Sequence, residues 1–167
     1  QVDAGAVLLL PRDFEGAPEG NDLEIIASQA ESEPVYHRIS NFLATTVLRE
    51  GEAVLARNVE DDSMLSVKDS KGELHATSIL CAPVRQGRIV VGLIHLYATS
   101  SAKVPDPDDL EFTLAVAENV ALALKNLTRQ QELAENLTIR QDEIVQLRER
   151  LGAESEIVGS SAPMGKV

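Results

Sequence analysis

The amino-acid sequence is poor in several residue types, and each shortage excludes a class of protein. It has no tryptophan, three phenylalanines and two tyrosines, so its core must be built mainly from aliphatic side chains. Its single cysteine, Cys81, cannot form an internal disulfide, which fits a reducing cytoplasm. No apolar run approaches the roughly 20 residues of a membrane-spanning helix.

Positive charge is also scarce. The 167 residues include 15 Lys and Arg against 27 Asp and Glu, which gives a formal net charge of -12. Nucleic acids and anionic membranes are bound through clustered Lys and Arg, so this charge argues against both as direct partners.

The sequence begins at Gln1 without a signal-like segment, and we expect the chain to be part of a longer protein.

The strongest pattern is a pair of apolar runs. Ile79–Val84 and Ile89–Tyr97 lie on either side of a polar tetrad that contains Gly87. Short aliphatic and β-branched runs around a Gly-containing turn predict a β-hairpin. Because both faces of both runs are almost entirely apolar, we expect this hairpin to be covered on both sides and to lie in the centre of a sheet.

The position of the turn fixes which residues of the hairpin face each other. A two-residue turn at Gln86-Gly87 predicts Leu80 opposite Leu93, Cys81 opposite Gly92 and Ser78 opposite His95. In this pairing Ser78 and His95 share a face, and Cys81 points to the other face. No carboxylate is placed to orient the imidazole, so these residues do not predict a nucleophilic triad.

Weaker patterns predict the remaining elements of one domain of ordinary size. Ser40 can cap a helix that Gly51 ends, with Ile39, Phe42, Leu43, Val47 and Leu48 on one stripe. Strands are predicted over Ala4–Leu10, Leu23–Ser28 and Ala53–Arg57. The stretch Asn58–Leu74 is the least regular, with turn residues at Asp69–Gly72.

A long helix is predicted from Pro107 to Leu151. Asp106 can cap it, proline suits its first position, and two further aspartates place negative charge at its positive end. No Gly or Pro follows before Gly152, so the helix would be about 65 Å long. This is far longer than a domain of this size needs.

Apolar residues along the long helix predict a parallel homodimer. The later ones fit the a and d positions of a heptad, with Arg140 interrupting at one d position. A solvated helix with a few apolar residues is the alternative. The residues expected in the dimer interface are Leu110, Leu114, Val120, Leu124, Leu127, Leu133, Leu137, Ile144, Leu147 and Leu151.

The heptad register changes within this helix. The stripe through Val120, Leu124 and Leu127 lies one residue out of register with the stripe through Leu133 and Leu137. A helix satisfies both stripes only by local overwinding or underwinding. Two arrangements of similar energy are what a conformational switch requires, so the slip predicts a signalling role.

Motifs for catalysis or metal binding are weak. His37, His75 and His95 lack the spacing of metal ligands, and one cysteine is available to join them. Cys81 lies in an apolar strand, where packing is the more common role than redox chemistry or cofactor attachment. We therefore expect no enzyme activity and no metal, and the sequence leaves the cofactor unknown.

The order of elements and the segments SILCAPV and GRIVVGLIHLYA resemble a GAF domain, a small-molecule-sensing module. The resemblance covers Ala4 to Asn126. It implies an α+β fold with a central antiparallel sheet and flanking helices, followed here by the long coiled-coil helix. GAF domains usually begin with a helix before the first strand, and its absence here supports the expectation that the chain is truncated.

In GAF domains the ligand lies between the sheet and the segment before the hairpin, which corresponds here to Asn58–Ser78. The resemblance therefore implies five polar candidates for ligand binding, and an ordinary surface or core role is the more common one for each. They are Arg57, Asn58, His75, Ser78 and His95.

Members that bind cyclic nucleotides carry an Asn-Lys pair after the last strand. Thr99–Lys103 lacks this pair, so a cyclic nucleotide is disfavoured.

The final residues, Glu156–Val167, resemble the opening of the AAA+ ATPase domain of sigma-54-dependent transcriptional activators. Gly159 and Gly165-Lys166 superficially suggest a phosphate-binding loop. Their spacing is one residue too long, and Val167 stands where Ser or Thr must ligate magnesium. The match identifies a neighbouring domain and confers no ATPase activity on this chain.

Together the two resemblances imply three parts, namely a GAF-like sensor over 1–128, a signalling helix over 129–152 and the start of an AAA+ domain over 153–167. The predicted function is small-molecule sensing and dimerisation that control the attached ATPase in a cytoplasmic protein. The expected partners are a second copy, the AAA+ domain and a small molecule. The alternative is a structural dimerisation module without a ligand.

Overall fold

The computed structural model describes residues 2–30, 36–59, 67–69, 72–74, 76–100 and 102–159. The predicted α+β fold, with a central antiparallel sheet followed by a long helix, is confirmed. In chain order the elements are β1 (Ala4–Leu9), the short 3-10 helix η1 (Gly20–Asp22), β2 (Glu24–Ala30), α1 (Asn41–Glu50), β3 (Val54–Arg57), β4 (Val67–Asp69), β5 (Gly72–Leu74), β6 (Ser78–Gln86), β7 (Ile89–Ala98) and α2 (Pro107–Gly159).

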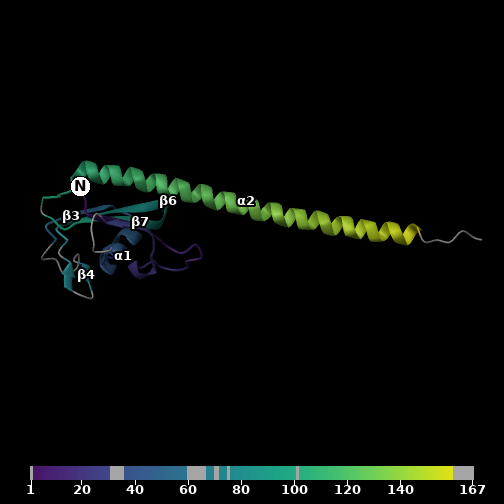
Figure 1. Cartoon of the computed structure of the whole chain (residues 1–167), viewed down its shortest axis with the longest axis horizontal. Helices are drawn as coiled ribbons and strands as arrows, with labels where there is room; N and C mark the ends of the chain where they lie inside the picture. The colour runs from purple at the N-terminus through teal and green to yellow at the C-terminus, as the bar shows by residue number, and fades with distance from the viewer. Residues whose placement is uncertain are drawn as a thin grey trace, which may run out of the picture. The chain divides into compact units, whose positions relative to one another are not determined.

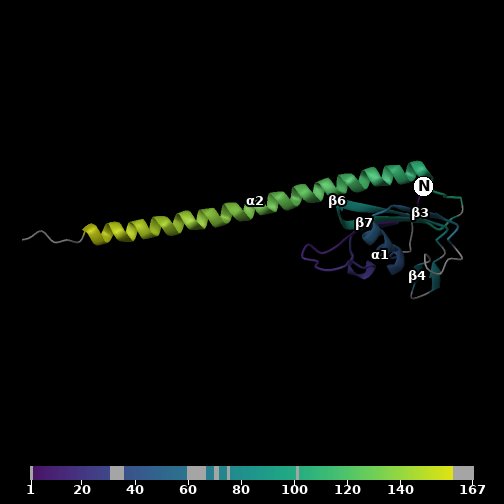
Figure 2. The ribbon, with the colours of Figure 1, turned by 180° about the vertical axis from the view of Figure 1, so that it is seen from behind.

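Five of the strands form one antiparallel sheet in the order β2-β1-β7-β6-β3. Helix α1 lies on one face of this sheet, and the first turns of α2 lie on the other (Figures 1 and 2). Because both faces are covered, β6 and β7 are buried along most of their length, as predicted for a central hairpin. The first turns of α2 bury Thr113, Ala117 and Ala121, which share one helix face.

The predicted register of the hairpin is wrong. The turn lies at Gly87-Arg88, one residue later than predicted, and Gly87 supplies the positive φ of 67°. A bulge between Val84 and Arg85 displaces the pairing further. As a result Cys81, rather than Ser78, lies opposite His95. Ser78 pairs with Ala98, and Leu80 pairs with Leu96.

Helix α1 has the predicted caps. The Ser40 Oγ accepts the Leu43 N–H at 3.3 Å, and Gly51 adopts the left-handed conformation with its N–H donated to the Val47 carbonyl at 2.9 Å. Four members of the predicted stripe are buried, but Phe42 is 51 % exposed. Phe42 directly precedes Leu43 and therefore lies about 100° away from it around the helix.

Residues 58–74, predicted to be irregular, contain an additional small hairpin. Strands β4 and β5 pair with each other and form a sheet separate from the main one. The turn predicted at Asp69–Gly72 falls where β4 ends and β5 begins. Residues 60–66 lie outside the described part of the chain.

Helix α2 begins as predicted and ends later. Asp106 and Asp109 form reciprocal caps, since each accepts the backbone N–H of the other at 2.9 to 3.0 Å. The helix has 53 residues and continues through Gly152 to Gly159. A single glycine inside a helix costs about 1 kcal/mol relative to alanine and does not end it. Residue contacts divide the chain into Gln1–Ala123 and Leu124–Val167.

Candidate functional site

A group of buried rings lies on the α1 side of the sheet. The Tyr36 hydroxyl and the His95 Nδ1 are 2.7 Å apart. The His95 ring centroid is 5.6 Å from that of Tyr36 and 5.5 Å from that of Tyr97, and the two tyrosine rings are 6.0 Å apart. We call Tyr36, His95 and Tyr97 the ring cluster.

Strand alternation explains how a histidine reaches this core. Side chains of β7 alternate between the two faces, so Leu93, His95 and Tyr97 all point toward the α1 side. His95 is 0 % exposed and Tyr97 is 3 % exposed. Tyr36 comes from the segment before α1. It is 59 residues away from His95 in the sequence, so no local pattern predicted this contact.

Burial keeps all three rings uncharged. Loss of contact with water lowers the pKa of His95 to about 3, so its imidazole is neutral at physiological pH. Burial also raises the pKa of the Tyr36 hydroxyl, although a hydrogen bond from the Ile39 backbone N–H acts in the opposite direction. The pKa of Tyr97 is raised mainly by burial as well.

The environment of the ring cluster leaves imidazole nitrogens without a partner. Among the described residues, the Nε2 atoms of His95 and His37 are buried and have no hydrogen-bond partner. The His37 backbone N–H donates to the Tyr97 hydroxyl oxygen at 3.1 Å, which ties His37 to the same cluster. Buried polar atoms are rarely left unpaired in native proteins, so this cluster is a candidate binding site.

Cys81 lies beside the ring cluster, which corrects the sequence prediction that it points away from His95. The two residues are paired across β6 and β7 and therefore share a face. The thiol is fully buried, and burial raises its pKa. A protonated, buried thiol is a poor nucleophile, so its surroundings favour packing over chemistry.

The structure describes four of the five predicted ligand residues, and it does not bring these four together. His95 lies in the ring cluster, whereas Ser78 and Arg57 face each other across β6 and β3. Asn58 is exposed and has a positive φ of 56°. His75 lies outside the described residues. The ligand-binding roles of all five residues stay predictions.

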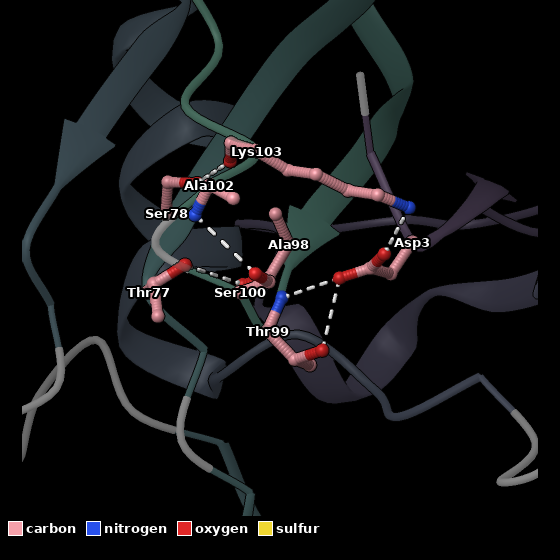
Figure 3. A network of polar contacts seen from close by, with 8 residues as sticks. All are labelled: Asp3, Thr77, Ser78, Ala98, Thr99, Ser100, Ala102 and Lys103. Atoms are coloured by element: carbon pink, nitrogen blue, oxygen red, sulfur yellow. Dashed lines mark hydrogen bonds and ion pairs between the residues drawn. The ribbon is translucent and has the colours of Figure 1, made fainter.

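Ser78 takes part in a polar network where β7 leads into α2 (Figure 3). Its Oγ donates to the Lys103 carbonyl at 3.3 Å. The Asp3 carboxylate accepts hydrogen bonds from the N–H and hydroxyl of Thr99 and forms an ion pair with the Lys103 ammonium. Lys103 and Thr99 hold the pKa of Asp3 below its usual value. The residues Asp3, Ser78, Thr99 and Lys103 are called the junction network below.

Arg57 adds a second attachment at this end of the sheet. Its Nε donates to the Pro105 carbonyl at 2.9 Å, one residue before the Asp106 cap of α2. The start of α2 is therefore attached to β1 through Asp3, to β6 through Ser78 and to β3 through Arg57. Asp3 and Lys103 are 100 residues apart, so sequence patterns did not reveal their contact.

A groove with a volume of about 460 Å³ lies on the opposite side of the sheet from the ring cluster. It is lined by β1, by Ala27–Ala30 of β2, and by Ile94 and Leu96 of β7. The sequence predicted a cavity elsewhere, between the sheet and Asn58–Leu74. Much of that location lies outside the described residues, so its cavity stays a prediction.

The residues predicted to form the dimer interface differ in exposure along α2. The first four, Leu110, Leu114, Val120 and Leu124, are partly buried. The later six are 49 to 65 % exposed, namely Leu127, Leu133, Leu137, Ile144, Leu147 and Leu151. Exposed apolar residues at heptad spacing are typical of a coiled-coil seam, and their pairing stays a prediction.

The described part of the chain lacks the features of two classes of site. None of the helices in this part has the length and apolar character needed to cross a membrane. The same residues contain no group of three or more His, Cys, Asp or Glu side chains placed to hold a metal ion.

The chain matches a known family along most of its length. The GAF domain model matches residues 1–124. A search of curated proteins found no match.

Solved structures with a similar fold include both GAF domains and an enzyme. The GAF domain of an Acinetobacter phosphoenolpyruvate-protein phosphotransferase is 16 % identical, with a TM-score of 0.58 over 77 % of this chain and 74 % of that chain. The GAF-B domain of DevS from Mycobacterium smegmatis is 19 % identical, with a TM-score of 0.55 over 79 % and 86 %. The type II free methionine-R-sulfoxide reductase from Thermoplasma acidophilum is 15 % identical, with a TM-score of 0.52 over 72 % and 77 %. At these identities the likeness shows the fold alone.

Proposed function

This chain belongs to the GAF domain family, whose members sense small molecules and transmit signals, and we propose that it is a regulatory sensor that controls an attached AAA+ ATPase. In this proposal two copies are joined through α2. A small molecule bound on the sheet alters α2, and α2 passes the change to the ATPase of a sigma-54-dependent transcriptional activator.

One observation carries the proposal. A single helix of 53 residues begins at a fixed attachment to the sheet and continues with exposed apolar residues at heptad spacing. At 1.5 Å per residue this helix is about 80 Å long. Its first turns alone are enough to cover one small sheet. The remainder is suited to pair with a second copy and to carry a signal.

The junction network supports a route from the sensor to the helix. Arg57 ends β3, directly before the segment that the family resemblance assigns to the ligand, and it donates to the carbonyl that precedes the α2 cap. A shift of β3 or β6 would therefore move the start of α2. Contacts of this kind between a sheet and a helix can convert a small displacement of a strand into a change between two arrangements of the helix.

The link to sigma-54-dependent transcription rests on sequence alone. Glu156–Val167 resemble the opening of the AAA+ domain of those activators, and the order of sensor, helix and ATPase occurs in that family. Residues 160–167 lie outside the described part of the chain. The proposed ATPase partner is therefore supported by the residue pattern and not by geometry.

A reductase function is the alternative that the similar fold of methionine sulfoxide reductases raises. The residues of this chain argue against it. Thiol-based reduction needs a thiolate, whereas Cys81 is fully buried with a raised pKa. The 167 residues contain no second cysteine with which it could form a disulfide. We therefore propose a non-enzymatic role.

Insertions in α2 test the proposed regulation. In the longer protein, one to seven residues would be inserted between Arg129 and Glu135, and ATPase activity would be measured for each variant. We expect regulation to be lost and then restored near seven residues, because a heptad insertion returns the seam to its register. Insertions beside Gly16, in an exposed turn, serve as the control and should leave regulation unchanged.

A smooth response that does not depend on insertion length would contradict signalling through the helix register. It would favour a spacer that fixes distance alone. Unregulated ATPase activity in the unmodified longer protein would instead favour the ligand-free dimerisation module.

A further inference from the structure

Six residues in the later part of α2 recur at heptad spacing and form one stripe, which we call the seam. Five of them are apolar and one is charged, and all six are exposed in the single chain. Residues seven positions apart are equivalent in a heptad. Position a is taken by Leu137, Ile144 and Leu151, and position d by Leu133, Arg140 and Leu147.

Arg140 lies in the middle of the seam without a firm counter-charge in its own helix. Among the described residues its side chain forms no ion pair. Residues three and four positions apart are neighbours on a helix surface, and Glu143 is the only acidic neighbour of this kind. A basic residue that precedes its acidic neighbour is the less favourable order for such a pair. The charge of Arg140 is therefore poorly compensated within the chain.

Pairing with a second copy would bring this charge against itself. In a parallel pair of helices in register, each residue at position d faces the same residue of the other helix. Arg140 would therefore meet Arg140 of the second copy. Two like charges repel, and the long side chains can relieve this only by bending away from the seam toward water. The layer that contains Arg140 would then lack the apolar packing of its neighbours.

Glu143 and Arg148 favour the parallel orientation. They occupy positions g and e, which flank the seam, and a parallel pair brings position g of one helix to the next position e of the other. Glu143 would face Arg148 of the second copy on both sides of the seam. Arg148 has no acidic residue three or four positions away in its own helix, so a second helix is well placed to supply one.

An antiparallel pair fits the same charges poorly. The antiparallel register that overlaps the whole seam places Leu133 opposite Leu151 of the second copy. Positions g then lie beside each other, so Glu143 would face Glu143 of the second copy. Like charges across an interface disfavour an arrangement, whereas opposite charges support it. The flanking charges therefore select the parallel pair.

We propose that the seam binds a second copy in parallel and in register, and that Arg140 forms a weak layer which keeps this pairing near balance. The five apolar residues supply the attraction, Glu143 and Arg148 fix the orientation, and Arg140 opposes association. This inference rests on the proposed signalling through α2 and adds to it how the helix pair is regulated. A pair held near balance responds to a small input from the sensor.

The first test is Arg140→Leu in the whole chain, which replaces the weak layer with an apolar one. We expect the dissociation constant of the dimer to fall by about tenfold or more, because a polar residue in the seam costs stability. Asp142→Leu is the matched control, since position f points away from the seam, and it should change the constant by less than about twofold. Sedimentation equilibrium measures both. An unchanged constant for Arg140→Leu would overturn the weak layer.

The second test asks whether position 140 faces itself. The unmodified chain and Arg140→Glu are mixed in equal amounts, with one of them labelled with nitrogen-15, and native mass spectrometry counts the dimers. A mixed dimer places Arg opposite Glu, so we expect mixed dimers to exceed the half that random exchange gives. Mixed dimers at the random share would contradict a parallel pair in register.

The third test exchanges the flanking charges. Glu143→Arg and Arg148→Glu should each weaken the dimer by about fivefold, because two attractive pairs become repulsive. The two substitutions together restore opposite charges and should return the dissociation constant to within about twofold of the unmodified value. A double exchange that is weaker than both single ones would overturn the parallel orientation.

The outcomes separate this inference from the proposed function. A dimeric unmodified chain that Arg140→Leu does not strengthen would overturn the weak layer and leave signalling through α2 standing. A monomeric unmodified chain with a dimeric Arg140→Leu would support the weak layer and contradict the stable dimer of the proposed function. If both chains were monomeric, the seam itself would be wrong.

Discussion

Side chains of β6 are buried from Ser78 to Val84, whereas the large apolar side chains of α2 from Leu127 to Leu151 are 49 to 65 % exposed. Both regions are rich in aliphatic residues, but they use them differently. The hairpin buries its residues within one chain, between helices on two faces of the sheet. The apolar residues in the later part of α2 have no comparable cover among the described residues, and we propose that they pack against a second copy.

This difference separates two properties that a sensor needs. The sheet provides a stable framework that can hold two tyrosines and a neutral histidine in its core. We propose that the arrangement of the helix depends on association with a second copy and can therefore be changed at small cost. The predictions below test this contrast from the largest expected effect to the smallest.

Leu93→Ala should lower the free energy of unfolding of the sheet by about 2–5 kcal/mol, as for other fully buried leucines. Leu93 is 0 % exposed, whereas Leu137 in α2 is 61 % exposed. Leu137→Ala should therefore change the unfolding of the sheet little. Urea unfolding followed by tyrosine fluorescence measures both. Equal destabilisation by the two substitutions would contradict the difference in burial between the hairpin and the later part of α2.

Leu137→Asp combined with Ile144→Asp should weaken dimerisation by about 3 kcal/mol or more, roughly a hundredfold, because each carboxylate would enter an apolar seam. Ile139 and Val145 are also exposed but lie outside the predicted stripe, so Ile139→Asp with Val145→Asp is the matched control. Sedimentation equilibrium measures both. Similar weakening by the two pairs would mean that the seam is misassigned.

Stability of the sheet should depend on pH through His95. Its pKa is about 3 in the folded protein and about 6.5 in an unfolded chain. Between these values the unfolded chain binds a proton that the folded protein does not, so stability falls as pH decreases below 6.5. The loss should reach about 2 kcal/mol at pH 5. Urea midpoints at pH 7.5 and pH 5 should differ less for His95→Phe, and an unchanged difference would contradict a buried neutral imidazole.

Ser40→Ala should destabilise the sheet unit by about 1 kcal/mol, because the Leu43 N–H loses its capping partner. Ser40→Asp is the control, since aspartate can accept the same hydrogen bond. Thermal unfolding should rank the unmodified chain and Ser40→Asp above Ser40→Ala. A midpoint for Ser40→Ala that equals the unmodified value would show that the cap contributes nothing.

Asp3→Asn should have the smallest effect on stability, about 0.2–1 kcal/mol, because the ion pair with Lys103 is partly exposed. The same substitution should speed hydrogen exchange at the Thr99 amide, which donates to Asp3. Asp13→Asn, in an exposed turn, is the control. Unchanged exchange at Thr99 would contradict the role of Asp3 in holding this junction.

Features that depend on neighbouring residues were predictable from the sequence. Ser40, Gly51 and Asp106 mark helix ends because caps involve residues three or four positions apart, and the structure has all three. The central hairpin followed from its two apolar runs. Its register did not, because the bulge after Val84 leaves no clear signal in the residue pattern.

Contacts between distant residues were not predictable. Tyr36 meets His95 across 59 residues, and Asp3 meets Lys103 across 100. His95 was predicted as a ligand candidate, but nothing near it in sequence indicated that two tyrosines surround it. Ser78 and Arg57 were predicted as ligand candidates, and that role stays a prediction. Their hydrogen bonds to backbone carbonyls ahead of α2 were not predicted.

Native mass spectrometry of the purified chain at about 20 micromolar tests the central claim most directly, because one spectrum reports both association and retained small molecules. We expect a species of twice 18.0 kDa for the unmodified chain and a single chain for the variant with Leu137→Asp and Ile144→Asp. A spectrum of the unmodified chain that contains the 18.0 kDa species alone would contradict it.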